Sequence, residues 1–287
     1  MGTAIVRDGD TATTMIPTQV PRRIGLSHGF FAIAAASLGI LSLTYGDFAP
    51  SGQTLPGWIP WRETWVYLSA LILLAASVGL CFSRTALPSA LTIGAYQAVW
   101  AVIGTTPILS EPLRIGAWYG FCEALTSLVG AWIVYVMLQR QSRASEMPIA
   151  SQRAVRAAQV LFGFTCVFYG WSHFAYADYT ASMVPAWLPG RMEFAYLTGL
   201  GHIAAGIGIV VGILPRLAAT LEAIMMSLFG LLVWVPSFLA QPRPEWATPP
   251  QNQWSELVVN LLLAASAWIV ATSLRNRAWG FASSSTR

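Results

Sequence analysis

Four polar side chains stand inside long apolar stretches of the chain: Glu123, His202, Glu222 and Asn260. If those stretches lie in a membrane, an ionisable group among them costs at least about 2.5 kcal/mol at the bilayer centre and is a candidate for chemistry. His202 and Glu123 each stand about eight residues, or about 12 Å, from the same predicted membrane surface. A glutamate–histidine pair at one depth would relay a proton or hydrogen-bond a carbonyl group of a bound molecule.

Glu222 and Asn260 allow other roles. Glu222 stands about 9 Å from the opposite predicted surface, where it would be protonated or would line a vestibule. Asn260 suits a hydrogen bond between helices. The same structural interpretation is open for His202 and Glu123, because a buried polar side chain bonded to a carbonyl or hydroxyl also holds helices together.

A second group of polar and aromatic residues falls near the end of an apolar stretch. His173 has Tyr169 and Tyr196 nearby, and Trp187 lies in the loop between them. Such a group would bind a polar headgroup or a small ligand at the outer face. It would equally serve as the aromatic belt that anchors a helical bundle at the membrane–water interface.

The composition is that of a membrane protein. Of the 287 residues, 55% are hydrophobic and only 10% are charged, whereas a soluble domain carries about 25% charged residues. Cys81, Cys122 and Cys166 form no C-x-x-C or metal-ligand spacing, so neither a metal site nor a redox dithiol is predicted. The net charge of +4 is too small for a nucleic-acid-binding surface.

Each of eight apolar runs is long enough for a membrane helix, which needs about 20 residues. They are 24–46, 65–83, 86–108, 115–138, 154–174, 194–214, 216–238 and 254–274. Only helices and closed barrels satisfy the backbone in lipid, and no run alternates like a barrel strand. The fold class predicted is therefore all-α, a polytopic membrane protein with eight transmembrane helices.

Arginine placement orients these helices. Four of the 16 basic residues, Arg62, Arg114, Arg191 and Arg243, fall on one side, which leaves twelve on the other. The positive-inside rule then places both the N-terminal tail 1–23 and the C-terminal tail 275–287 in the cytoplasm. The predicted location is the inner cell membrane.

The chain also repeats itself. Pro56–Pro60 (PGWIP) recurs as Pro185–Pro189 (PAWLP), and Ala131–Val134 (AWIV) recurs as Ala267–Val270. The repeats are predicted at 24–138 and 154–274, joined by a cytoplasmic linker at 139–153. An even number of helices per unit makes these parallel repeats, two four-helix bundles related by an axis along the membrane normal.

The second half resembles the DoxX family of small four-helix membrane proteins. The resemblance is carried by three stretches: Gly170–Phe174 (GWSHF), Val184–Pro189 (VPAWLP) and Thr198–Gly208 (TGLGHIAAGIG). The first half matches in outline only, with Asp47 where His173 stands and Leu73 where His202 stands. The resemblance implies a four-helix bundle and, through the subunit that names the family, an association with quinone reduction.

Three functions stay open at this stage. The first is a redox-associated membrane subunit that binds a quinone or lipid near His202 and Glu123 and works with a partner subunit. The second is a small-solute or proton-coupled transporter, and the third is a non-catalytic scaffold or assembly factor. Besides a quinone no cofactor is expected, the lipid bilayer is the one certain partner, and autonomous enzymatic activity is not predicted.

Overall fold

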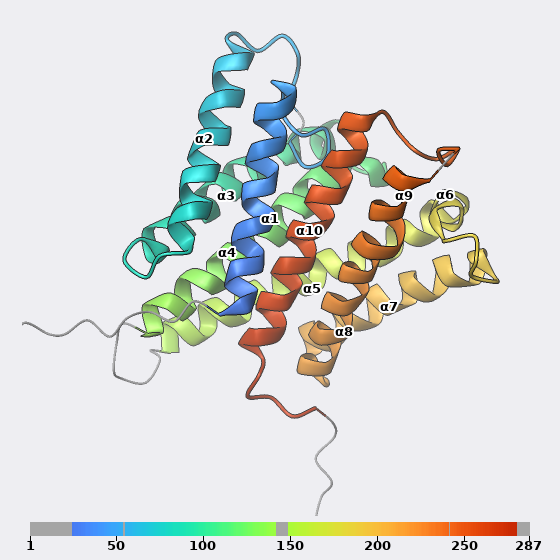
Figure 1. Cartoon of the computed structure of the whole chain (residues 1–287). Coiled ribbons are helices and arrows are strands. Elements are labelled where there is room, and N and C mark those ends of the chain that lie inside the picture. Colours follow the sequence, from blue (N-terminus) through green and yellow to red (C-terminus); the bar gives the residue numbers. More distant parts are fainter. Residues whose placement is uncertain (1–24, 54, 142–148, 241, 280–287) are drawn as a thin grey trace, which may run out of the picture.

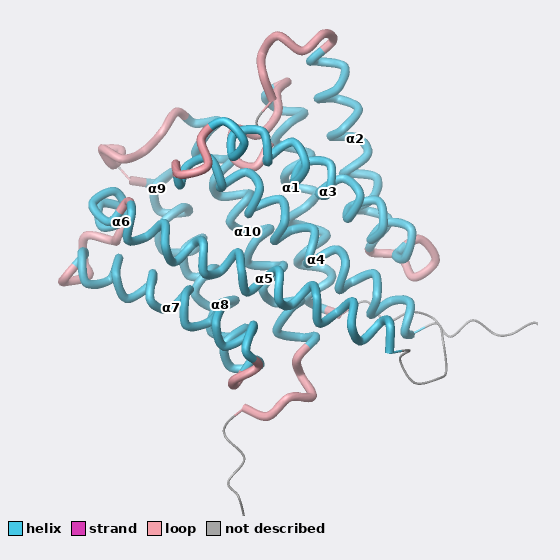
Figure 2. The backbone as a smooth tube through the Cα atoms, turned by 180° about the vertical axis from the view of Figure 1, so that it is seen from behind, coloured by secondary structure: helices cyan, strands magenta, loops and turns pink. Residues whose placement is uncertain are grey.

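Hydrocarbon offers no hydrogen-bond partners, so apolar runs of this length fold into helices that satisfy their own backbone. The computed structural model describes residues 25–53, 55–141, 149–240 and 242–279, and within these ranges every regular element is helical (Figures 1 and 2). The all-α prediction is confirmed. The predicted tail 1–23, residues 142–148 of the predicted linker and residues 280–287 lie outside the described residues.

The helices follow one another with short connections. The first half contains α1 (Leu26–Tyr45), α2 (Arg62–Leu80), α3 (Ala86–Ser110), the 3-10 helix η1 (Ile115–Trp118) and α4 (Tyr119–Gln141). The second half contains α5 (Ile149–Ala175), α6 (Ala177–Met183), α7 (Arg191–Val211), α8 (Pro215–Phe229), η2 (Gly230–Trp234), α9 (Val235–Leu239) and α10 (Pro250–Ser273). The short helix α6 occupies part of a segment that the sequence predicted as loop, and α4 and α5 both extend into the predicted linker.

Seven of the described helical segments are long and apolar enough to cross a membrane: α1, α2, α3, η1 with α4, α7, α8 through α9, and α10. These segments are those of a polytopic membrane protein. Helix α5 has 27 residues but is not among the seven, because polar side chains such as Arg153, Arg156 and Gln159 lower its hydropathy.

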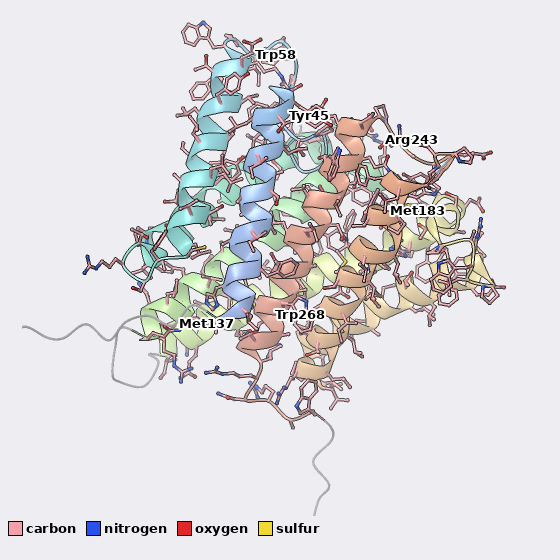
Figure 3. The ribbon with its side chains drawn as sticks, viewed as in Figure 1. Tyr45, Trp58, Met137, Met183, Arg243 and Trp268 are labelled. Atoms are coloured by element: carbon pink, nitrogen blue, oxygen red, sulfur yellow. The ribbon has the colours of Figure 1, made fainter. Side chains whose placement is uncertain are left out.

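The long helices form two layers. In Figure 1, α2, α1, α10 and α8 lie side by side nearer the viewer. Helices α3, α4, α5 and α7 form the second layer, which faces the viewer in Figure 2 because that view is from behind. Between the layers, α2 contacts α3, α10 contacts α4, and α8 contacts α7. The connections α1–α2 and α9–α10 lie at one end of the bundle, which is called the loop end below (upper in Figure 1). Trp58 and Arg243 mark the loop end in Figure 3, whereas Met137 and Trp268 lie near the other end.

One helix of the front layer changes its winding. Residues Gly230–Trp234 form a π-helical turn between α8 and α9, closed by a hydrogen bond from the Val235 N–H to the Gly230 carbonyl. Pro236 follows within the same helical stretch and has no backbone N–H to continue the α-helical pattern. Turns of this type occur mostly as single insertions in α-helices, frequently at functional sites.

Glycines permit the closest helix contact, between α5 and α7. A β-carbon placed at Gly206 would lie 2.5 Å from the Gly163 carbonyl oxygen and 2.8 Å from the Val167 side chain. A β-carbon at Gly170 would likewise lie 2.5 Å from the Gly199 carbonyl oxygen. Membrane helices pack closely where small residues let the backbones meet, so this contact sets the distance between α5 and α7.

We therefore expect Gly206→Val to destabilise the protein by about 1–3 kcal/mol or more, because the added side chain must push two backbones apart. The measurement is the unfolding midpoint of purified protein in detergent. Gly29→Val is the matched control, because nothing lies within 4 Å of a β-carbon at Gly29 in α1. Equal midpoints for the two variants would contradict the close contact between α5 and α7.

Candidate functional site

A cavity of about 1180 Å³ lies between α4, α5, α7, α8 and α10, and most of its lining residues come from the second half of the chain. Its walls are mostly apolar and aromatic, with a few polar side chains turned inward. Leu197, Leu221 and Leu228 line it although they are 61%, 55% and 43% exposed. The cavity therefore opens sideways between α7 and α8, on a surface that lipid would cover.

His202 and Glu222 form the most buried polar contact in its wall. The two side chains are each 1% exposed, and His202 Nδ1 lies 2.8 Å from Glu222 Oε1. His202 lines the cavity and Glu222 stands behind it. With Nδ1–H donating to the carboxylate, the imidazole is held in one orientation and its Nε2 is the nitrogen left for a ligand.

This pairing corrects the sequence-based hypothesis that joined His202 to Glu123. Helices α7 and α8 follow each other directly and pack together, so the carboxylate of α8 reaches the imidazole of α7. Glu123, on α4, lines the same cavity without bonding to His202. The second oxygen of Glu222, Oε2, is buried and has no hydrogen-bond partner among the described residues.

Three further rings surround the His202 imidazole. Ring centroids of His173, Phe229 and Tyr169 lie 5.1, 5.8 and 6.1 Å from it. The His173 Nδ1 lies 3.0 Å from Thr198 Oγ1, and the Tyr169 hydroxyl lies 3.1 Å from Thr126 Oγ1 on α4. These rings form an aromatic box of Tyr169, His173, His202 and Phe229 at the inner part of the cavity.

The predicted outer-face group thus divides. Tyr169 and His173 line the cavity beside His202. Tyr196 stacks on Phe174 with ring centroids 5.6 Å apart, and Trp187 is 71% exposed in the loop before α7. Neither Tyr196 nor Trp187 is among the residues that line the cavity.

Closer to the loop end, acidic residues line the cavity. They are Glu123 on α4 and Glu256 on α10, and Tyr119 lines the cavity with them. The backbone of the α1–α2 loop closes over them: Ser51 Oγ donates a hydrogen bond to Glu256 Oε1 at 2.5 Å, and Gly52 adopts φ +77° against Glu123. Tyr119, Tyr179, Glu123, Glu256 and Asn260 are called the carboxylate chamber below.

The sequence pointed to Glu123 and Asn260 but missed Glu256. Glu256 lies in the second turn of α10. A charged residue so near the start of an apolar run looks like part of the polar segment that precedes the run. The available signal was its spacing, because Glu256 and Asn260 are four residues apart and share one helix face. Asn260 Oδ1 is buried and has no hydrogen-bond partner among the described residues.

Tyr179 stands on α6, outside the seven apolar segments. Burial, together with the nearby Glu256 carboxylate, raises the pKa of the Tyr179 hydroxyl. That hydroxyl therefore stays protonated and is a hydrogen-bond donor at the rim of the chamber.

The described residues offer neither a metal-binding cluster nor a disulfide at this site. Among the described residues, no cluster of three or more His, Cys, Asp or Glu side chains could hold a metal ion. The three cysteines are free, and Cys122 and Cys166 are buried. Cys166 lies close to Glu222.

Comparison with known proteins gives one match. A family model described as a domain of unknown function (DUF8561) matches residues 162–271. No curated protein and no solved structure matches the chain. The matched segment contains His173, His202, Glu222, Glu256 and Asn260, but not Tyr119 or Glu123.

The His202–Glu222 contact predicts a non-additive response to mutation. His202→Leu or Glu222→Leu alone should destabilise the protein by about 3 kcal/mol, because each leaves a buried polar partner unpaired. The double variant should be more stable than either single variant, since two apolar side chains need no partner. Unfolding in mixed detergent micelles measures all four proteins. Additive losses would show that the two side chains do not interact.

Proposed function

We propose that this chain is a DoxX-like inner-membrane protein of eight transmembrane helices, with both termini cytoplasmic and α5 as the eighth helix. In this arrangement α1–α4 and α5–α10 are parallel repeats. The neighbour contacts support it: α1–α2, α2–α3 and α3–α4 in the first half have the counterparts α5–α7, α7–α8 and α8–α10 in the second. The contacts α1–α10 and α5–α4 between the halves also exchange under a two-fold axis.

We further propose that the cavity binds a lipophilic molecule of the quinone class, taken from the bilayer. The observation that carries this proposal is the placement of His202, which is fixed by Glu222 and stands in an aromatic box that lines a largely apolar cavity. Apolar pockets with a few convergent polar groups are the usual form of a small-molecule site. The opening past Leu221 and Leu228 gives an isoprenoid or alkyl tail a route from lipid.

The residues of the box fit a flat headgroup with carbonyl oxygens. When His202 is protonated, Glu222 stabilises the imidazolium and Nε2–H donates to a carbonyl oxygen. His173 and Phe229, stacked on each other with centroids 5.9 Å apart, form an aromatic surface against which the headgroup would lie. A quinone site of this kind makes the chain a redox-associated subunit, because the electrons must come from a partner.

A second candidate function is proton-coupled or small-solute transport. It is favoured by Glu123 and Glu256, which place two acidic groups in the same cavity as His202. Transport would appear as solute counterflow in proteoliposomes, whereas a redox-associated subunit binds quinone without moving a solute.

The eight-helix topology can be tested with reporter fusions. Green fluorescent protein fused after Arg287 should fluoresce, and alkaline phosphatase inserted within residues 242–249 should be active, because an even number of crossings returns the chain to the cytoplasm. A fusion within residues 142–148 should also report the cytoplasm. An active phosphatase after Arg287 would mean an odd number of crossings and would remove α5 or another helix from the membrane.

The quinone proposal is tested by binding. Short-chain ubiquinone and menaquinone analogues should quench the tryptophan fluorescence of the protein in nanodiscs saturably. His202→Leu should weaken this binding at least tenfold, because it removes the hydrogen bond to the carbonyl oxygen. His28→Leu is the matched control, since His28 is a buried histidine of α1 outside the cavity. Equal affinities for wild type and His202→Leu would refute the proposed headgroup position.

A further inference from the structure

We propose that the carboxylate chamber is a second ligand site, which binds the positively charged group of an organic ammonium ion. The proposal is independent of the quinone contact at His202. It concerns the part of the cavity nearer the loop end, where Glu123, Glu256 and Asn260 meet the rings of Tyr119 and Tyr179. Three observations carry it: acidic side chains without a cationic partner, acceptors without donors, and aromatic walls.

The first observation is the missing counter-ion. Ion pairs among the described residues are Arg62–Asp47, Arg114–Glu111 and His202–Glu222. None of them includes Glu123 or Glu256. A carboxylate removed from water is costly unless a cation or several hydrogen bonds compensate it.

The second observation is the surplus of acceptors. Glu123 is 9% exposed, and no described residue donates a hydrogen bond to its carboxylate. Glu256 receives one hydrogen bond, from Ser51. Asn260 also lines the cavity, although its buried Oδ1 lies against Gly230. An alkylammonium group brings both the positive charge and the N–H or polarised C–H donors that the two carboxylates lack.

The third observation is the aromatic wall. Tyr119 and Tyr179 line the same cavity as Glu123 and Glu256. Ring faces beside carboxylates are the surroundings in which proteins recognise ammonium ions through cation–π contacts. The only cationic side chain that lines the cavity near this end, Arg114, is paired with Glu111 at the rim, so it leaves the two carboxylates available.

Glycines are also part of the cavity wall: Gly52, Gly116 and Gly120 are among the residues that line it. A β-carbon at Gly52 would lie only 3.3 Å from Glu123 Oε2, so the glycine keeps position 52 from crowding that carboxylate. The ammonium group has two sources, a soluble amine or the headgroup of a membrane lipid, and both have the same chemistry at this site.

The test uses radiolabelled tetraethylammonium and the full chain in nanodiscs of phosphatidylglycerol, with scintillation proximity as the readout. Wild type should bind the ion saturably. Glu123→Gln and Glu256→Gln keep the shape of the side chain but remove its charge, so each should weaken binding at least tenfold. Tyr119→Leu should weaken it severalfold through the loss of the ring. Glu63→Gln, at an exposed glutamate of α2, is the matched control and should bind like wild type.

The outcomes separate the two proposals. Ammonium binding that persists in His202→Leu supports the chamber even if quinone binding fails. A lower apparent affinity in discs that contain phosphatidylethanolamine identifies the lipid headgroup as the natural source, and an unchanged affinity identifies a soluble amine. Absence of saturable binding to wild type, or wild-type affinity in both glutamine variants, overturns the proposal and leaves a proton as the occupant of the carboxylate pair.

Discussion

The contact between α4 and α10 is the constraint on which the rest of the structure depends. These two helices join the layers at the centre of the bundle. Glycine at position 130 lets them pack tightly, since a β-carbon there would lie 2.6 Å from Ser266 Oγ and 2.9 Å from the Phe31 ring. Every other long helix lies against one of them or against a helix that does. The same two helices carry Glu123, Glu256 and Asn260 at their loop ends, so the packing at the centre sets how far apart the carboxylates stand.

The two halves of the chain differ in how their interiors are filled. In the first half, Phe48, Val66, Trp100 and Ala124 form a packed apolar cluster, with the Phe48 and Trp100 rings 5.0 Å apart edge to face. Leu73, which stands where His202 stands in the second half, is 1% exposed and belongs to the apolar core. The second half instead supplies most of the residues that line the cavity, among them His173, His202 and Glu256. Close packing stabilises the filled interior of the first half, and the residues that line the cavity lack such packing on one side.

The sequence predicted the helices and several residues of the site. It did not predict the partner of His202 or the π-helical turn, and each has a physical reason. Apolar run length predicted the helices, and position along each run placed Glu123 and His202 at one depth, where both line the cavity. The partner of His202 depends on helix rotation, which is set by close contacts such as Gly201 against Met225 and Gly208 against Ala218. Hydropathy carries no information on rotation. The π-helical turn escaped prediction for a similar reason: Gly230 abuts Asn260 Oδ1 on α10, a contact between residues that are distant in the sequence.

The loop of Pro50–Gly52 belongs to the first half, yet it forms part of the wall of the cavity in the second. Tyr119 and Glu123 also come from the first half, whereas the matched family segment begins at residue 162. A free-standing protein of that length would keep the His202–Glu222 pair and lose one side of the chamber. Residues from both halves of the chain are therefore needed to enclose the carboxylate chamber, and the matched family segment carries only part of its wall.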